Sequence, residues 1–371
     1  MKNNYLPIIL TATAFGLIAG ITGALFANLY NTGGSTLAFN RELNLSNYGA
    51  LASNLVIRDP KKVVVNQDVK TDETIRDLRA SLLSVFVKEE GIDAYYELSR
   101  PFARALAATT DGWIMAAWPQ NLSEAEAKKV ISEYVVIDSS RKLYEIDQVL
   151  VSPEKVGAFV FLHLKDASSL NVRRLVPDVE IKTGQSLLLA TGRDSFLLNA
   201  LGSKVVETAL SSSDAYPQEL SLAYAESSAP AFVFNLSGEV VGAFDWQGQW
   251  LVAPELDAYW RSLLKTRSLA WPVLGVNYLN LAAVAGNEKL PEKGALLQNN
   301  AELPAVLKNS PADKAGLKYG DIITRLNGVE INVENDLAIL LSAYNPGDSV
   351  SVSYSRNGTN FQTEVVLGSG K

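Results

Sequence analysis

Residues 227–242 read SSAPAFVFNLSGEVVG, which is an apolar run, a short polar break and a second apolar run. The run Phe232-Val233-Phe234 favours a β-strand, and Val240-Val241 favours a second one. Ser237-Gly238 between them is typical of a tight turn, because glycine accepts the positive φ that such turns need. This stretch therefore predicts a β-hairpin, and the polar residues before it predict a loop.

The composition is that of a globular protein long enough for more than one domain. The chain has 371 residues, of which 47% are hydrophobic and 20% charged. A net charge of −7 argues against a nucleic-acid partner, because phosphate binding requires a basic surface. Cysteine is absent and His163 is the single histidine, which excludes disulfides, thiol catalysis and multi-histidine metal sites. The sequence predicts neither a metal nor a cofactor.

The amino-terminal residues favour a membrane anchor. Residues 3–40 carry no charged side chain, and residues 6–30 are almost continuously apolar. A helix needs about 20 apolar residues to cross a bilayer, and this run supplies them. A cleavable signal peptide is the alternative, although its apolar region usually has only about 7–15 residues. Lys2 precedes the run, so the positive-inside rule predicts a cytoplasmic amino terminus and an extracytoplasmic bulk, either periplasmic or at the cell surface.

The residues after the anchor predict mostly strands. A short helix is expected from about Thr71, followed by a strand at Leu82–Val87. Residues 105–118 predict strand, turn and strand. Further strands are expected in the ranges 155–164, 182–192 and 198–206, a polar loop at 211–226, and a helix at 254–266.

The stretch 227–242 resembles the nucleophile loop of trypsin-like serine proteases of the HtrA (Deg) type, whose pattern is GNSGGPLVNxxGEVVG. Aligned without gaps, Asn235 and residues 238–242 fall on their counterparts, and the nucleophilic serine falls on Ala229. Pro230 replaces a glycine of this loop, and it lacks the N–H that an oxyanion hole would use. The resemblance thus implies a protease fold without its nucleophile.

The other two triad positions are also replaced. Residues 105–118 resemble the family segment that ends in the catalytic histidine, where this chain has Pro119, or Trp118 with a one-residue shift. Residues 155–164 resemble the strand that carries the orienting aspartate, which falls on Ala158, or on Gly157 with the same shift. None of these side chains can accept a proton from a hydroxyl.

One alternative to an inert barrel remains from the residues themselves. A serine–lysine pair that uses Ser227 or Ser228 would give an active serine endopeptidase with a non-standard arrangement, and a lysine base would need its pKa lowered by burial. His163 lies in an apolar strand, where a structural or surface-facing role is expected rather than that of a general base.

Residues 272–368 resemble a PDZ domain of the HtrA type. The matching residues are 274–276, 294–296, 310–317, 320–323, 327–328 and 346–350. The resemblance implies that Leu274, Gly275 and Val276 form a carboxylate-binding loop beside an exposed strand edge, where a partner's C-terminus adds a strand. A helix at 334–344 would form the opposite wall with Leu337 and Leu341, which could equally be core leucines.

These features together predict a mainly β, membrane-anchored pseudoprotease with a transmembrane helix, a trypsin-like two-barrel domain and a PDZ domain. The expected parts are a cytoplasmic tip and anchor at 1–31, an extracytoplasmic linker at 32–65, a degenerate protease domain at 66–255, a linker helix at 256–271 and a PDZ domain at 272–371.

The expected partners are protein C-termini or unfolded polypeptides, and the membrane through the amino-terminal helix. The resemblance further implies a homo-trimer or assembly with active relatives, a scaffold or regulatory role, and work in protein quality control. An envelope structural protein that binds no peptide is the remaining alternative.

Overall fold

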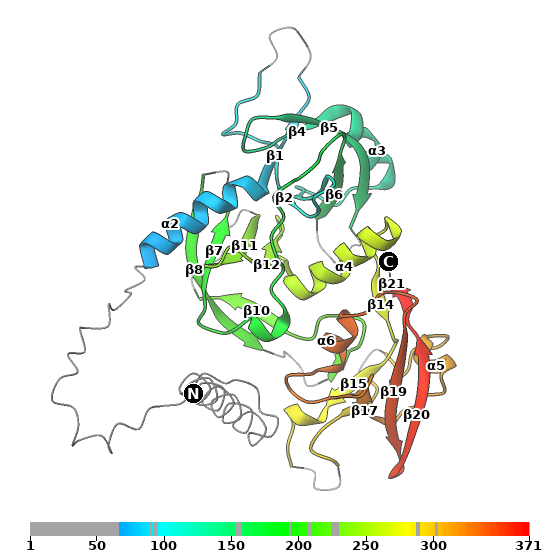
Figure 1. Ribbon diagram of the computed structural model, residues 1–371. Helices are drawn as coiled ribbons and strands as arrows, with labels where there is room; N and C mark the ends of the chain where they lie inside the picture. The colour runs from blue at the N-terminus through cyan, green and yellow to red at the C-terminus, as the bar shows by residue number, and fades with distance from the viewer. Residues whose placement is uncertain are drawn as a thin grey trace, which may run out of the picture. The chain divides into compact units, whose positions relative to one another are not determined.

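The computed structural model describes most of the chain from residue 67 onward (Figure 1). The described ranges are 67–89, 91, 95–152, 158–192, 194–205, 210–223, 230–286, 290–300 and 303–370. The expected anchor and linker lie outside these ranges, as do Gly157, Ser227, Ser228 and Ala229. Among the helices within them, none combines the length and the apolar character that a bilayer crossing requires.

The first part of the described chain is a closed six-stranded barrel with the strand order β1-β2-β3-β6-β5-β4. Its strands are β1 (Leu82–Val87), β2 (Ala103–Ala107), β3 (Trp113–Ala117), β4 (Tyr134–Ile137), β5 (Leu143–Val151) and β6 (Phe159–Leu164). Its helices are α2 (Gln67–Leu78), the 3₁₀ turn η2 (Arg79–Ser81) and α3 (Glu124–Glu133). The strands expected at 82–87 and within 105–118 are confirmed.

The second part is a six-stranded sheet with the order β10-β8-β7-β11-β12-β13. Its elements are the 3₁₀ turn η4 (Asp178–Glu180), β7 (Ser186–Ala190), β8 (Phe196–Val205), β10 (Glu219–Leu222), β11 (Ala231–Asn235), β12 (Val240–Phe244) and β13 (Trp250–Val252). The hairpin expected in residues 227–242 is confirmed, because β11 pairs antiparallel with β12. Gly238 in its turn has a φ of 75°, and the Asn235 side chain accepts from the Ser237 and Glu239 amides.

Strand β3 shows why the barrel and the second sheet pack together. Ile114 and Ala116 point into the barrel core. Trp113 and Met115 alternate with them and join a second core that includes Phe232 of β11. Because neighbouring residues of a strand face opposite sides, a strand that is apolar throughout must be covered on both faces.

Helix α4 (Ala253–Thr266) follows the second sheet and contributes Leu256, Trp260 and Leu263 to that shared core. Proline in its first turn suits the helix start, and Arg267 ends the helix in the left-handed conformation with a φ of 54°. Arg261 on this helix donates to the carbonyl oxygens of Ala343 at 2.8 Å and Tyr344 at 3.2 Å, and also to that of Ser342.

The carboxy-terminal part holds a seven-stranded sheet and a two-stranded ribbon (Figure 1). The elements are β14 (Trp271–Val273), β15 (Asn277–Asn280), η5 (Leu281–Ala283), β16 (Ala295–Leu297), α5 (Pro311–Lys314), β17 (Ile322–Leu326), β18 (Val329–Glu330), α6 (Leu337–Ser342), β19 (Ser349–Arg356), β20 (Thr359–Val366) and β21 (Gly368–Gly370). Helix α6 is shorter than the helix expected at 334–344. The mainly β class is confirmed.

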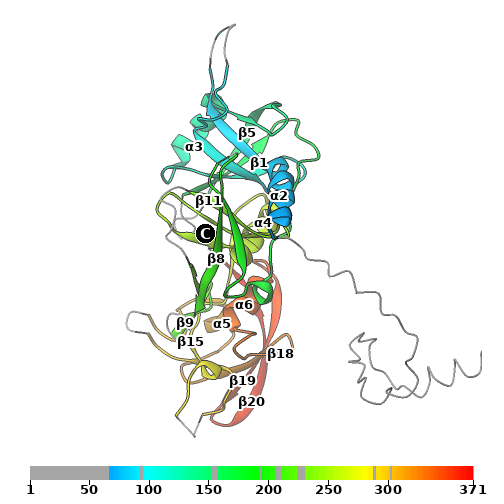
Figure 2. The same cartoon turned by 90° about the vertical axis from the view of Figure 1, so that its left-hand side faces the viewer.

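One strand of this last sheet comes from elsewhere in the chain. Residues 211–226 were expected to form a polar loop, but Leu210–Ser212 form strand β9, which pairs with β15. The sheet order ends β16-β15-β9, so β9 occupies the edge of the sheet beside β15 (Figure 2).

Glu255 is the one acidic side chain in the first turn of α4 and is strongly desolvated. Its Oε2 atom accepts from the Val252 amide at 3.3 Å. Enclosure by the surrounding protein raises the pKa of this carboxyl to about 7, against the smaller opposing effect of the Val252 amide. The folded protein therefore holds a proton on Glu255 that the unfolded chain releases at lower pH.

The free energy of unfolding is expected to fall as the pH rises between about 4.5 and 7. In this window the folded state binds more protons than the unfolded state, so the stabilisation is complete below the unfolded pKa and lost above the folded one, by up to about 3 kcal/mol. Glu255→Gln should flatten this part of the profile in urea unfolding, whereas Glu330→Gln on the surface should leave it unchanged. A profile that stays equally steep in Glu255→Gln would contradict this assignment.

Candidate functional site

Two residues that the sequence alignment brought to triad positions, Trp118 with the one-residue shift and Ala158, are hydrogen-bonded to each other. Trp118, which precedes Pro119, donates its amide to the Ala158 carbonyl at 2.8 Å. Ala158 in turn donates its own amide to Oδ2 of Asp245 at 3.1 Å. The alignment that assigned the histidine and aspartate positions therefore brings together residues that are neighbours in space, while Ala229 lies outside the described residues.

Packed aromatic rings and backbone hydrogen bonds surround these positions. Trp118 is buried, with its ring 4.8 Å from that of Phe102 and 5.1 Å from that of Tyr134. Asp245 is also buried, and its Oδ1 atom accepts from the Gln247 and Gln249 amides at 2.8 and 2.9 Å. Asp245 thus binds backbone donors.

His163 has both ring nitrogens occupied. Nδ1 lies 2.6 Å from Oδ1 of Asp147, and Nε2 lies 3.1 Å from the Asp111 carbonyl oxygen. The imidazole also packs against Trp113, with ring centroids 5.1 Å apart. A ring whose two nitrogens both face acceptors has none left to take a proton from a hydroxyl, so His163 has a structural role in this arrangement.

The loop Leu274-Gly275-Val276 lies between β14 and β15 and presents three backbone N–H groups on one side. The Leu274 and Gly275 amides both donate to one carboxylate oxygen, Oδ1 of Asp214, at 3.0 Å each. The Val276 amide donates to the hydroxyl of Ser213, also at 3.0 Å. Convergent amides of this kind form a concave site for an anion.

Gly275 gives this loop its shape. Its φ is 84°, in the left-handed region that favours glycine. A Cβ atom built on it would lie 2.3 Å from Cβ of Ser310, which caps α5. Position 275 therefore combines a positive φ with a close approach by another side chain.

The structure brings the four apolar residues expected at the groove into one cluster. Leu274, Val276, Leu337 and Leu341 are each at most 1% exposed and belong to the same core as Tyr278. They place α6 against β15 and the loop. Their contribution to peptide contact stays a prediction, because burial in a core accounts equally well for these side chains.

Tyr278, Asn280 and Asp336 form a polar cluster beside this core that the sequence analysis did not predict. The Tyr278 hydroxyl donates to Oδ1 of Asp336, and Nδ2 of Asn280 donates to Oδ2 of Asp336 at 2.8 Å. Asp336 also caps α6 through the Ala338 amide at 3.0 Å. Burial raises the pKa of Asp336, against the opposing effects of its hydrogen bonds, and burial likewise raises that of Tyr278. An aspartate just before a helical pattern was the available signal for the cap.

Within the described part of the chain, no group of three or more histidine, aspartate or glutamate side chains could hold a metal ion.

Part of the chain matches a known domain family. Residues 272–367 match the PDZ domain family. The predicted resemblance to HtrA-type serine proteases with a PDZ domain is confirmed by sequence relatives.

Three curated relatives illustrate the similarity. A probable periplasmic DegP-like serine endoprotease of Hahella chejuensis is 31% identical over 159 residues, 37% of this chain and 30% of that protein. The serine protease Do-like HtrA of Bacillus subtilis is 36% identical over 109 residues, 28% of this chain and 24% of that protein. The zinc metalloprotease RasP of Shouchella clausii is 45% identical over 60 residues, 16% of this chain and 14% of that protein. The chain thus matches less than a third of the length of each relative.

Two solved structures are similar to part of this chain at low sequence identity. The HtrA-type protease AlgW with a decapeptide has a TM-score of 0.47 and 14% identity, covering 81% of this chain and 99% of that one. The serine endoprotease from Yersinia pestis has a TM-score of 0.43 and 13% identity, covering 81% and 98%.

Gly275→Ala is expected to destabilise the PDZ domain more than Gly320→Ala. Both glycines have a φ near 84°, so each substitution should cost about 1 kcal/mol for the backbone alone. Only at Gly275 does the new methyl group meet Ser310, which should add about 1–3 kcal/mol. Urea unfolding of the two variants would measure the difference, and equal losses would contradict the account of this loop.

Proposed function

We propose that this protein is a membrane-anchored, extracytoplasmic HtrA-like pseudoprotease that binds C-terminal or unfolded peptide segments through its PDZ domain. The observation that carries the proposal is the loop of Leu274, Gly275 and Val276, whose amides all donate to oxygen atoms at a sheet edge. A loop that already binds a carboxylate oxygen with two amides has the chemistry to bind the carboxylate of a peptide C-terminus.

Loss of catalysis is supported by the residues at the former triad positions. Pro119 and Ala158 have no side chain that can accept or orient a proton, and His163 is fully hydrogen-bonded elsewhere. The sequence places alanine at the nucleophile position. A role as scaffold or regulator, in protein quality control or beside active relatives, would follow from binding without cleavage.

The anchor and the location are proposed from the sequence. The apolar run at residues 6–30 and the lysine before it support a single crossing with the bulk of the chain outside the cytoplasm. The periplasmic endoprotease among the relatives fits this location. Assembly as a homo-trimer is proposed from the family resemblance alone.

The second candidate is an active serine endopeptidase with a non-standard arrangement. The names of the relatives favour it, since several are serine proteases. Fold similarity does not carry catalysis when the reacting groups are replaced.

The purified chain is expected to cleave neither casein nor unfolded model substrates, and to resist labelling by a fluorophosphonate probe. Cleavage needs a nucleophile paired with a base, and the triad positions supply neither. Turnover that disappears in Ser227→Ala or Ser228→Ala, with an unchanged far-UV spectrum, would instead establish the endopeptidase.

A peptide library presented to the full chain is expected to show binding that requires a free C-terminus. The loop amides recognise the terminal carboxylate, so amidation of the same peptides should reduce their affinity at least tenfold. Fluorescence anisotropy up to millimolar peptide would measure this. Equal affinities for free and amidated peptides would count against C-terminal recognition.

A further inference from the structure

The edge of the PDZ sheet is already occupied by a strand from the same chain. Strand β9 pairs antiparallel with β15, with Leu210 opposite Leu279, Ser211 opposite Tyr278 and Ser212 opposite Asn277 (Figure 2). The pairing continues beyond β9, since the Ser213 amide donates to the Val276 carbonyl at 2.9 Å. Ser213 is completely buried.

The carboxylate that follows this strand occupies the amide-lined loop. Oδ1 of Asp214 accepts from the Leu274 and Gly275 amides and from the hydroxyl of Ser213, the last at 2.7 Å. The Ser213 hydroxyl also accepts from the Val276 amide. A side-chain carboxylate thus makes the bonds that a chain-terminal carboxylate would make in the same loop.

The side chains of the strand fit the groove as well. Ser211 lies opposite Tyr278, and its hydroxyl makes a hydrogen bond to the Tyr278 side chain. Tyr278 is itself bound to Asp336 at the start of α6. Residues 210–214 therefore contact the loop Leu274-Gly275-Val276, strand β15 and the polar cluster at the start of α6.

The origin of the segment explains how it is held there. Along the chain, β9 comes between β8 and β10, which pair with each other in the second six-stranded sheet. We call the closed barrel and this second sheet together the barrel domain. The connection from β8 to β10 thus leaves that sheet, adds a strand to the PDZ sheet and returns. Because it is attached at both ends, it competes with free ligands at a high effective concentration.

We propose that residues 210–214 are an internal ligand that keeps the PDZ groove closed, with the Asp214 carboxylate in the place of a peptide C-terminus. This inference rests on the proposed function, since it concerns the same groove. A strand edge pairs with one strand at a time, so a free peptide can bind only after β9 leaves β15. Its measured affinity is then reduced by the small fraction of molecules with an open groove.

The internal segment also indicates the chemistry of the ligand that replaces it. A peptide whose last residue takes the place of Ser213 puts its third residue from the end opposite Tyr278, where Ser211 now lies. The groove should therefore favour free C-termini with serine or threonine at that position, because Tyr278 and Asp336 offer hydrogen-bonding partners there. Release of the segment would alter the connection between β8 and β10 in the barrel domain.

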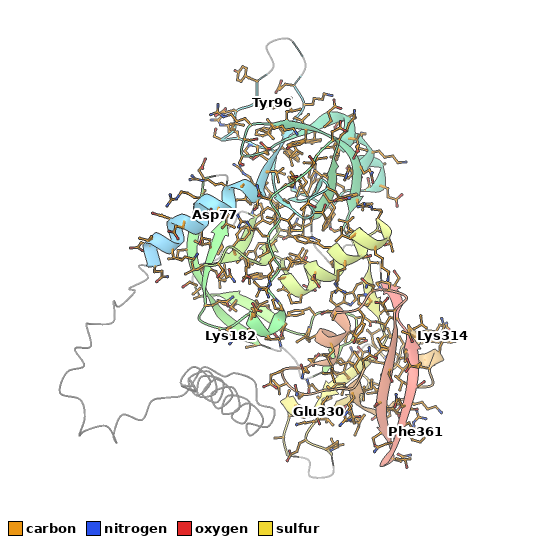
Figure 3. The ribbon with its side chains drawn as sticks, viewed as in Figure 1. Asp77, Tyr96, Lys182, Lys314, Glu330 and Phe361 are labelled. Atoms are coloured by element: carbon orange, nitrogen blue, oxygen red, sulfur yellow. The ribbon has the colours of Figure 1, made fainter. Side chains whose placement is uncertain are left out.

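The first test measures binding of a labelled peptide that copies residues 206–213 and ends in a free carboxylate. Asp214→Asn and Asp214→Ala in the full chain are expected to lower its dissociation constant at least tenfold, because the internal ligand loses its charge-assisted bonds. Glu330→Gln, which changes the charge of the same domain at an exposed residue (Figure 3), is the matched control and should leave the affinity unchanged. Equal affinities in the unaltered chain and both Asp214 variants would overturn the proposal.

A second test closes the groove covalently. The Ser213–Val276 hydrogen bond makes the next pair, Ser212 and Asn277, a non-hydrogen-bonded pair, whose Cα atoms approach to about 4.5 Å. The chain has no cysteine, so Ser212→Cys with Asn277→Cys should form one disulfide across β9 and β15. The oxidised protein should lose peptide binding and regain it on reduction. Binding that is the same in both states would contradict an internal ligand.

A third measurement separates this proposal from the function it rests on. Hydrogen exchange of the Leu274, Gly275 and Val276 amides needs no added peptide. Exchange is expected to be slow in the unaltered chain and at least tenfold faster in Asp214→Ala, and equal rates would overturn the internal contact. Faster exchange in a variant that still binds no free C-terminus would leave the internal contact standing and contradict peptide binding.

Discussion

A backbone N–H group withdrawn from water must find an acceptor, since an unpaired buried donor costs about 1–3 kcal/mol. The loop Leu274-Gly275-Val276 presents three such donors in one concave site, and Gly275 shapes it through a φ of 84°. Their acceptors are oxygens of Ser213 and Asp214, which lie some 60 residues earlier in the chain. The 210–214 segment therefore satisfies the loop and completes the sheet at the same time, because it supplies the acceptors of all three amides.

The same requirement links the two domains. Strand β9 extends the PDZ sheet, yet both of its neighbours along the chain, β8 and β10, belong to the barrel domain. On the other side, Arg261 of α4 donates to the carbonyls that end α6. Both contacts reach elements around the groove, so a ligand that displaces β9 acts on β15 and on the barrel at once. Apolar packing adds to these hydrogen bonds, because Trp271 of β14 belongs to the same core as Tyr259 of α4.

Much of the fold could be predicted from the sequence because it depends on local residue patterns. The hairpin of β11 and β12 follows from apolar runs around Ser237-Gly238. The loop before β15 was implied by the resemblance of residues 272–368 to a PDZ domain. Strand β9 was not predictable, because Leu210–Ser212 is short, rich in serine and paired with a partner distant in sequence. The bond from Tyr278 to Asp336 was missed for the same reason, since nothing local to either residue indicates the other.

Under the proposed function, the barrel domain holds the 210–214 segment in place instead of cleaving a substrate. The segment between β8 and β10 connects two paired strands of this domain. The tip of this connection pairs with β15 of the PDZ sheet, and packed aromatic rings and backbone hydrogen bonds surround Trp118 and Ala158. A rigid sheet that presents a tethered strand competes with free ligands far better than a loose peptide would, because its ordering cost is already met by folding. The barrel domain would then hold residues 210–214 in the PDZ groove. A free C-terminus would have to bind more tightly than this segment to displace it.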